Sequence, residues 1–254
     1  MAHLKEHKFD NGISILNLGD IHFGNSAFYR PLLDKAVAYI LNNADCYWLS
    51  TGDILEMALK DSLSFAYGGM APSQEYAQVI EILKPIADKC LGLVESNHHN
   101  RMNRATSFSV DKMLADELKI PFLGPINVIK VTCGAAAYYI AMLHGSGGGK
   151  MRGGKVNNTQ NLVNIIGGCD VYLNGHTHTY NHFPDLIYYV DKKRGSLIGM
   201  ESQFVTTGHC LKYMDSYAAG KWFPTPMGFA EITLGAAVNG TNNNGKSVSC
   251  KLFK

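Results

Sequence analysis

The first half of the chain alternates short apolar runs with longer amphipathic segments. In the segment from Phe28 to Asn42, apolar residues recur every three or four positions, which is the period of a helix. The same period predicts helices over 76–89, where Pro85 should kink or end the helix, and over 109–118. Short apolar runs followed by polar or glycine residues predict strands at 13–18, 47–49 and 91–94. Strands that alternate with helices in this way indicate an α/β fold.

The second half is dominated by pairs of apolar runs that predict hairpins. One pair covers 127–132 and 137–143, and another covers 187–190 and 196–200. A helix is expected near 158–166, and further strands at 171–173 and 229–234. We expect the glycine-rich segment 145–154 and the end of the chain, 236–254, to be loop. These elements favour two packed sheets with helices outside them, in a single domain over residues 1–254.

The composition limits the class of protein without naming a function. With 46% hydrophobic and 17% charged residues, 254 residues can bury a sizeable core. The net charge of +2 does not give the basic stripe of a dedicated nucleic-acid-binding protein, although a local basic rim stays possible. Six evenly spread cysteines without a C-x-x-C pair predict reduced thiols and a cytoplasmic location. No apolar run reaches the ~18 residues of a membrane span, and the charged N-terminus lacks a signal peptide.

Polar residues of one chemical kind follow five of the predicted strands. The clearest case is Asn-Gly-His-Thr-His at 174–178, which puts two imidazoles one residue apart after an apolar run. The other strand ends carry Asp20 with His22, Asp53, Asn97 with His98, and His144. In open α/β sheets, ligands bind beyond the carboxyl ends of the strands. Paired imidazoles favour Zn, Fe, Mn or Ni over Mg or Ca, so these residues are candidate metal ligands.

Each of these residues has an ordinary explanation when taken alone. Asp20 and Asp53 could form turns or cap helices, and a single histidine is more often structural or exposed than a ligand. The ordered combination favours a metal site, because it offers two carboxylates, one amide and several imidazoles. That set is sufficient for two ions, and two cations about 3.5–4 Å apart form the clamp used in phosphate ester hydrolysis.

The five blocks together resemble the calcineurin-like metallophosphoesterases, whose signature is D-x-H, GD, GNH[DE], H and GHxH. They occur in this order, over roughly residues 13 to 180, as Asp20-Ile21-His22, Gly52-Asp53, Asn97-His98, His144 and Gly175-His176-Thr177-His178. The segments HGSGGGKMRGG and SNHHNR are similar to phage and bacterial members. The resemblance implies two stacked mixed sheets flanked by helices, the four-layer sandwich of this family, and a hydrolase that acts on phosphate esters.

The resemblance also implies a role for each matching residue. One divalent ion would take Asp20, His22 and His178, the other would take Asn97, His144 and His176, and Asp53 would bridge them. Mn²⁺ is the expected metal, with Fe, Zn²⁺ and Ni²⁺ as alternatives, and a hydroxide bridging the ions would attack phosphorus. His98 would protonate the leaving oxygen or steady the phosphoryl group. Glu56 matches the acidic position that orients this histidine in some members.

Two residues depart from the family pattern. Ser96 replaces the usual glycine before Asn97, and it could crowd the turn or be forced to a positive φ. His99 replaces the acid that usually follows His98, and it could serve as a substitute acid or contact the substrate. We expect activity to survive these changes with a shifted pH profile or substrate range.

The glycine-rich segment raises a second hypothesis. Residues 149–155 fit the G-x-x-x-x-G-K pattern of a phosphate-binding loop, but Val156 follows where Ser or Thr should hold Mg²⁺. We therefore expect either a substrate rim carrying Lys150, Arg152 and Lys155, or a mobile surface loop. Arg101 could add to this rim, or could be a solvated helix-start charge, and His209 could line the pocket.

The sequence favours a phosphodiesterase acting on a nucleotide or nucleic acid, because His98 could serve an alkoxide leaving group. A phosphomonoesterase, including a protein phosphatase, is the alternative within the same chemistry. The third possibility is a non-catalytic binding module that keeps the fold. The retention of every ligand position argues against it.

Overall fold

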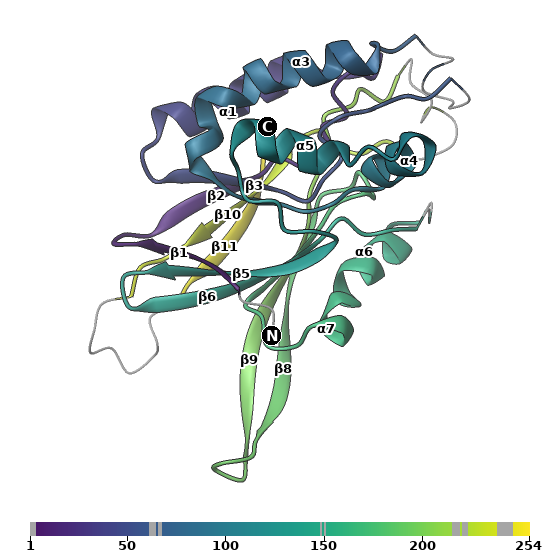
Figure 1. Ribbon diagram of the computed structural model, residues 1–254. Coiled ribbons are helices and arrows are strands. Elements are labelled where there is room, and N and C mark those ends of the chain that lie inside the picture. The colour runs from purple at the N-terminus through teal and green to yellow at the C-terminus, as the bar shows by residue number, and fades with distance from the viewer. Residues whose placement is uncertain are drawn as a thin grey trace.

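A computed structural model describes residues 4–60, 65, 68–147, 149, 151–214, 219, 223–237 and 246–254. Two mixed β-sheets pack face to face, and helices cover the outer face of each (Figure 1). This is the α/β arrangement expected from the sequence, so the predicted fold class is confirmed. Among the described residues, no helix is both long enough and apolar enough to cross a membrane.

The five-stranded sheet carries the first candidate ligands. Its strand order is β11 (Val248–Phe253), β10 (Phe229–Leu234), β2 (Ile13–Asn17), β3 (Cys46–Ser50) and β4 (Cys90–Leu93). Strands β2, β3 and β4 are parallel, whereas β10 runs antiparallel to both β2 and β11. Because parallel strands end on the same side, the loops after β2, β3 and β4 meet at one edge of the sheet.

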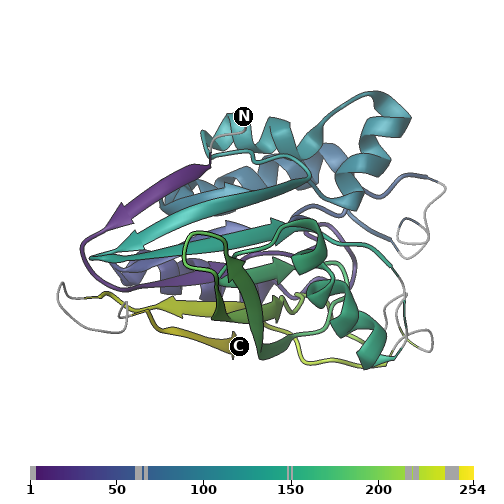
Figure 2. The same ribbon diagram turned by 90° about the horizontal axis from the view of Figure 1, so that it is seen from below.

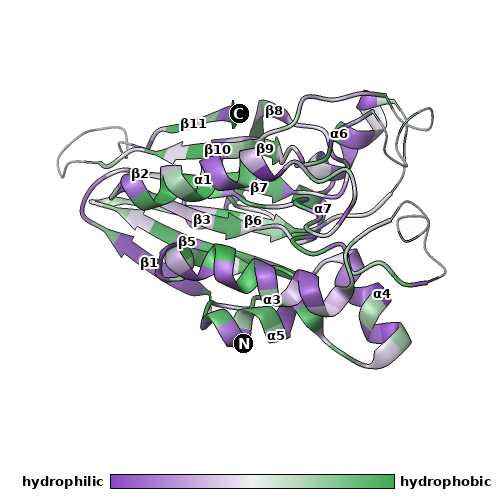
Figure 3. Ribbon diagram, turned by 90° about the horizontal axis from the view of Figure 1, so that it is seen from above, coloured by the Kyte–Doolittle hydropathy of each residue, from purple (hydrophilic) through white to green (hydrophobic). Residues whose placement is uncertain are grey.

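Three helices cover this sheet. They are α1 (Arg30–Asn42), α3 (Pro72–Leu83) and α5 (Val110–Leu118). Leu33, Val79 and Leu114 of these helices are fully buried in one cluster with Leu16 and Trp48 of the strands. The mixed colours of α1 and α3 in Figure 3 reflect this, since their hydrophobic residues face the sheet and their hydrophilic residues face solvent.

The six-stranded sheet carries the remaining candidate ligands. Its order is β1 (Lys5–Phe9), β5 (Ile126–Cys133), β6 (Ala136–Leu143), β7 (Val171–Asn174), β9 (Ser196–Thr206) and β8 (Asn181–Asp191). Figure 2 shows the purple β1 along the teal β5, to which it is parallel. Helices α6 (Arg152–Gln160) and α7 (Leu162–Ile165) cover the outer face, where Leu162 packs with Tyr172 and Phe204. Strands β6, β7 and β9 are parallel, so their carboxyl ends also meet at one edge.

Most predicted elements are confirmed with shifted bounds. The hairpin predicted at 187–190 and 196–200 is the longer β8–β9 pair, and the hairpin at 127–143 is β5–β6. The helix predicted over 76–89 begins at Pro72 and ends at Leu83, and a 3₁₀ helix, η1 (Lys84–Lys89), follows it at Pro85.

Four segments differ from the prediction. Residues 248–253 were expected to be loop but form β11, and the charged segment 5–9 forms β1. Both are edge strands held by backbone hydrogen bonds on one side, so neither needs an apolar pattern. Helix α6 begins at Arg152, inside the expected loop 145–154, and a helix that was not predicted, α4 (Asn97–Thr106), begins at a candidate ligand.

Candidate metal centre

The loops after β2 and β3 stay paired beyond the end of the sheet. The backbone N–H of Asp20 donates to the carbonyl of Gly52 at 3.0 Å, and that of His22 donates to the carbonyl of Asp53 at 3.0 Å. These two bonds hold three candidate ligands from different strands side by side. The loop after β7 joins them through the N–H of His176, which donates to the carboxylate of Asp20 at 3.0 Å.

Five candidate ligands have a left-handed backbone. Their φ values are 51° at Asp20, 53° at His22, 52° at Asp53, 68° at His176 and 50° at His178. Such a conformation costs a non-glycine residue roughly 1–2 kcal/mol. Among the described residues only three other non-glycine positions share it. Strain of this kind persists where the surrounding structure enforces it, and it is concentrated at functional sites.

Gly175 allows the loops of the two sheets to approach. A Cβ atom at this position would lie 2.9 Å from Oδ2 of Asp20 and 2.9 Å from Oγ1 of Thr51. Real Cβ atoms almost never come so close to another heavy atom. The glycine of the GHxH block is therefore needed for the packing of the two strand ends.

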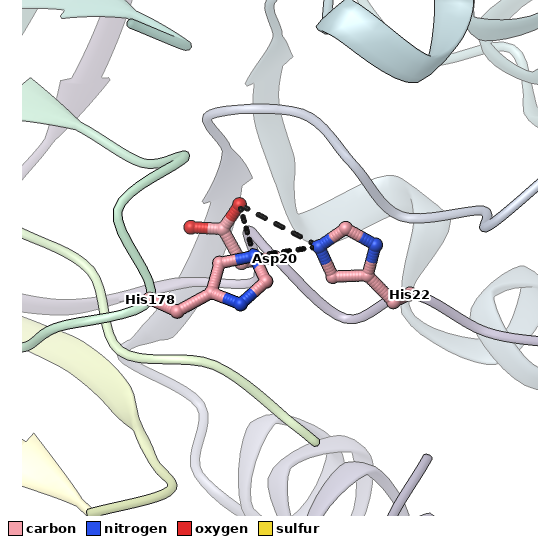
Figure 4. A group of neighbouring side chains, drawn as sticks. All are labelled: Asp20, His22 and His178. Carbon is pink, nitrogen blue, oxygen red and sulfur yellow. Dashed lines mark hydrogen bonds and ion pairs between the residues drawn. The ribbon is translucent and has the colours of Figure 1, made fainter. Parts of the chain in front are cut away.

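One group of ligand atoms comes from Asp20, His22 and His178 (Figure 4). The Nε2 atoms of His22 and His178 lie 2.8 Å apart, and they lie 4.0 Å and 3.8 Å from Oδ1 of Asp20. The two imidazoles come from different sheets and point toward each other and toward the carboxylate. This is the set that the resemblance implies for one ion.

A second group comes from Asp53, His144 and His176. Nε2 of His144 lies 3.2 Å from Oδ2 of Asp53, and the rings of His144 and His176 meet edge to face. The same Oδ2 lies 3.8 Å from Nε2 of His22, so Asp53 faces both groups. Asn97, the first residue of α4, lines the same pocket as Asp53 and His176.

Hydrogen bonds fix which imidazole nitrogen faces the centre. Nδ1 of His22 lies 2.9 Å from the carboxylate of Glu56, and Nδ1 of His144 lies 2.7 Å from the carbonyl of Thr51. Both partners are acceptors, so Nδ1 carries the proton in each ring. The Nε2 atoms of His22 and His144 then face Asp20 and Asp53. An outer partner that fixes the tautomer in this way is typical of metal-ligating histidines.

The donor set fits divalent cations. Carboxylate oxygens and imidazole nitrogens converge here, and Oδ2 of Asp20 is buried without a hydrogen-bond donor among the described residues. A buried acceptor without a partner is costly, and a bound cation would satisfy it. The mixture of imidazole and carboxylate suits Mn²⁺, Fe or Zn²⁺.

Burial and neighbouring charges shift the pKa values of the candidate ligands. Burial lowers the pKa of His176 to about 4 and holds that of His178 well below its usual value, so both rings are neutral near pH 7. Burial also raises the pKa of Asp20 to about 7. Burial opposes charge on His144 and Asp53 as well, but their attraction raises the pKa of His144 to about 9 and holds that of Asp53 well below its usual value.

His98 lies beside these groups at the start of α4. Its Nε2 atom is 3.8 Å from Oδ2 of Asp53, and its Nδ1 atom is 2.6 Å from the backbone carbonyl of Glu56. Arg101 donates to the same carbonyl at 2.7 Å. The Glu56 carboxylate is 2.9 Å from Nδ1 of His22 and 3.9 Å from that of His98. Glu56 thus contacts His98 mainly through its backbone, and its side chain orients His22.

The two departures from the family pattern are accommodated without strain. Ser96 has an extended backbone, with φ −108° and ψ 170°, so the expectation of a positive φ is wrong. It caps α4 instead, since its Oγ accepts from the N–H of His99 and donates to Asp111. His99 is buried and does not line the pocket, and its Nδ1 accepts from the N–H of Asp111.

The basic residues expected to bind substrate differ in where they lie. Lys150 lies outside the described residues. Arg152 is exposed at the start of α6 and does not line the pocket. Lys155 lines the pocket, and its ammonium donates to the carbonyl of Thr177 and the hydroxyl of Thr179, so it also supports the His176–His178 loop. Arg101 is the member of this set that lies next to His98.

Two residues from the end of the chain support His178. The ring of His209 stacks on that of His178, and Nδ1 of His209 accepts from the N–H of Leu211. Its Nε2–H therefore donates to the hydroxyl of Thr225 at 2.9 Å, and that hydroxyl donates to the carbonyl of His178 at 2.6 Å. The sequence offered His209 only as a pocket-lining residue, and no motif marks Thr225.

The candidate ligands open onto a cavity of about 210 Å³. Its lining includes the candidate ligands His22, Asp53 and His178 with His98, and also Leu211, Tyr213, Phe223 and Thr225. The cavity is therefore lined both by candidate metal ligands and by partly apolar residues.

No model of a known protein family matches the chain, and no curated protein matches it. Among solved structures, it is similar to a conserved uncharacterised protein of Streptococcus pneumoniae TIGR4 that is described as a predicted phosphoesterase. The identity is 10% and the TM-score 0.38, over 94% of this chain and 98% of the other. NAD nucleotidase of Haemophilus influenzae matches at 12% identity and a TM-score of 0.42 over 94% of this chain. The chain spans 49% of the length of that nucleotidase.

Proposed function

We propose that this chain is a metal-dependent phosphoesterase of the calcineurin-like type. The observation that carries the proposal is the convergence of carboxylates and imidazoles from both sheets on one cavity. We assign Asp20, His22 and His178 to one divalent ion, Asn97, His144 and His176 to the other, and Asp53 to both. The outer partners of Nδ1 in His22 and His144, which turn Nε2 toward the other assigned ligands, support this assignment.

Two divalent ions held by these residues would supply Lewis acidity toward a phosphate ester and would lower the pKa of water. The chain's own contribution is positioning. Asp53 is fixed between the groups by the N–H of His98, which donates to its Oδ1 at 3.2 Å. The loops of both sheets bury these groups, so the reacting phosphate would meet charges that are weakly screened by solvent.

His98 is the residue we assign to the leaving oxygen or the phosphoryl group. Its Nδ1–H is engaged by the carbonyl of Glu56, so Nε2 is the atom that faces the cavity. Burial lowers the pKa of His98, which keeps the ring neutral near pH 7 until a negatively charged phosphate binds. The nearby anionic group would then favour the protonated ring as a donor.

We favour a phosphodiester as the substrate, in a nucleotide or nucleic acid, because a histidine donor can serve an alkoxide leaving group. The test is hydrolysis of bis-p-nitrophenyl phosphate and p-nitrophenyl phosphate by protein loaded with Mn²⁺. Faster turnover of the diester is expected. Preference for the monoester would favour a phosphomonoesterase or protein phosphatase, and no turnover of either after metal loading would favour a binding module.

Asp53→Asn tests the shared ligand. Replacing the carboxylate with an amide removes the charge that faces both groups while it keeps the volume. We expect the bound metal to fall by at least one ion per chain, and kcat/KM for the diester to fall by at least about 10²-fold, the scale of losing one preorganised electrostatic group. Metal analysis and steady-state kinetics check this, and full activity with full metal content would contradict the dinuclear assignment.

His98→Ala separates the chemistry from metal binding. The substitution removes the candidate proton donor and none of the assigned ligands, so we expect unchanged metal content. Hydrolysis should slow more for an alkyl phosphate ester than for a p-nitrophenyl ester, because only the poorer leaving group needs the proton. The size of the effect should lie at about 10²–10⁴-fold for the alkyl ester. Equal slowing of both esters would assign His98 to phosphoryl positioning instead.

A further inference from the structure

The outer half of the β8–β9 hairpin extends beyond the rest of its sheet (Figure 1). Strand β8 forms the edge of the six-stranded sheet, and β9 is paired with β7 only over residues 203–206. Beyond that point, residues 185–202 form a two-stranded ribbon. An isolated two-stranded ribbon is marginally stable in water, so a ribbon of this length favours a contact with something else.

One face of the ribbon is apolar and exposed. Leu186, Tyr188 and Val190 of β8 are 53%, 62% and 66% exposed, and Leu197 of β9 is 68% exposed. Gly199 lies opposite Tyr188, and a Cβ there would be 3.2 Å from the tyrosine ring, so the glycine lets that ring lie across β9. The patch formed by these four side chains is called the ribbon patch below.

The ribbon patch continues the core. Side chains two residues apart on a strand share a face, so Leu197 lies on the face of β9 that carries Val205. Val205 is fully buried in the cluster between the two sheets. The other face is partly covered, because Ile187 packs against the cluster under α7 and the N–H of Gly168 donates to the hydroxyl of Tyr189. The face of the hairpin that packs between the two sheets therefore continues beyond the five-stranded sheet. There, no described residue of the same chain covers it.

The ribbon-patch residues of β8 direct their backbone N–H and C=O groups away from β9, toward the free edge of the sheet. The N–H of Gln203 donates to Asp170, beside β7, so the backbone of Gln203 faces away from β8. Its partner in the register, Pro184, then faces the free edge, which is the only side on which a proline is tolerated. Every second residue does the same, so the N–H and C=O groups of Tyr188 and Val190 also point outward.

An exposed edge with an uncharged run is normally avoided. Residues 186–190 read Leu-Ile-Tyr-Tyr-Val, without a charge or a proline to block pairing with another strand. Natural sheets protect such edges with charges, bulges or a covering element, and none covers this edge among the described residues. The apolar, unpaired edge of β8 therefore favours pairing with another strand.

The charges around this run match a second copy of the same ribbon. Asp185 lies at the base of the run, and the basic residues Lys192, Lys193 and Arg194 lie at the tip. When two copies of β8 run antiparallel, the base of one meets the tip of the other. In the register that sets Tyr188 opposite Val190 of the second copy, Asp185 comes next to Lys193 of the second copy. Both residues are exposed.

We propose that two copies of this chain pair through β8 as an antiparallel, two-fold symmetric dimer. The paired ribbons join the two six-stranded sheets into one continuous sheet. The ribbon patches of the two copies then lie side by side on one face of that sheet. A two-fold interface is self-complementary, as the exchange of Asp185 and Lys193 requires.

Light scattering coupled to size exclusion tests the dimer. The wild-type chain should elute with twice its mass of 27.8 kDa. Tyr188→Pro should elute as a monomer, because it removes an outward N–H and leaves the bonds between β8 and β9 intact. Leu186→Lys should also be monomeric, whereas Leu41→Lys, a change of an exposed leucine on α1, should remain dimeric. Far-UV circular dichroism and a thermal melt show that each variant is folded.

A charge exchange tests the register. Asp185→Lys and Lys193→Asp should each weaken the dimer by at least about fivefold, the effect of about 1 kcal/mol, and the double exchange should restore it. A wild-type monomer at every concentration up to the millimolar range would overturn the proposal. So would a dimer that Tyr188→Pro and Leu186→Lys leave intact. A monomer whose basic tip binds duplex DNA would overturn it as well and would identify the ribbon as a nucleic-acid arm.

Discussion

The unusual feature at the scale of single residues is that the candidate ligands are themselves strained. His176 has φ 68°, and its neighbour in the block, His178, has φ 50°. Neither conformation suits a residue with a Cβ atom, so the site holds its imidazoles in place at the expense of stability. Such a loss of stability is expected where the position of a side chain matters more for function than the free energy of folding does.

Replacing His176 separates strain from ligation. In the presence of a chelator, His176→Gly should be more stable than His176→Ala by about 1 kcal/mol, because glycine alone is relaxed at this φ. In an ordinary strand or helix the order would be the reverse. Urea unfolding of both variants measures the difference. Equal stability of the two, or a more stable alanine variant, would show that the backbone at 176 is not strained.

The sequence predicts which residues lie together in the candidate site, but it does not predict how their side chains are oriented. Asp20, Asp53, His144 and the two histidines of the GHxH block stand at strand ends, and the order of the blocks is visible in the sequence. The direction of the Glu56 side chain depends on a left-handed turn at Met57 and on the position of His22, which no local pattern encodes. His209 and Thr225 lie far from the blocks in the chain and reach His178 only through tertiary packing.

At the scale of elements, helix α4 shows how a departure from the family pattern is absorbed. The family's glycine is replaced by Ser96, which adopts an ordinary extended backbone and caps the helix that begins at Asn97. The side chain of Asp111 on α5 accepts from both the N–H and the hydroxyl of Ser96. Burial raises the pKa of Asp111 to about 6, and these two bonds offset part of that effect. The capped turn therefore ties α4 to α5.

Ser96→Ala and Ser96→Gly test the cap. Alanine should destabilise the fold by about 1 kcal/mol, because it removes the acceptor for the N–H of His99 and the donor to Asp111. Glycine, the residue of the family pattern, should cost only a few tenths of a kcal/mol at the cap itself. Thermal or urea unfolding gives both values. A glycine variant that is clearly less stable than the alanine variant would contradict the account.

The elements that the sequence missed share one physical property. Strands β1 and β11 lie at sheet edges and are defined by backbone pairing with β5 and β10 rather than by buried side chains. The start of α6 carries Gly153 and Gly154, which have low helix propensity, yet the helix forms because Lys155 and Thr159 are buried against β7 and the loop after it. Such contacts are tertiary, and a local pattern does not contain them.

For the molecule as a whole, the residues of the candidate metal centre come from both sheets. Asp20, His22 and Asp53 follow strands of the five-stranded sheet, whereas His144, His176 and His178 follow strands of the six-stranded sheet. An ion held by residues of both sheets can bind only when the sheets are packed together. Metal binding should therefore stabilise the whole fold and not one loop alone.

Removing the metal ion measures how much metal binding adds to the stability of the fold. At a free Mn²⁺ concentration about 100 times the dissociation constant, one site should add about 2.7 kcal/mol to the free energy of unfolding. For a chain of this length, that corresponds to a rise in melting temperature of roughly 5–10 °C over chelated protein. The variant Asp53→Asn should lose most of the rise, because its missing carboxylate faces both groups. Leu41→Lys on α1, an exposed position that does not line the pocket, should keep it. A melting temperature that does not change with Mn²⁺ would mean that the two sheets are not joined through a metal.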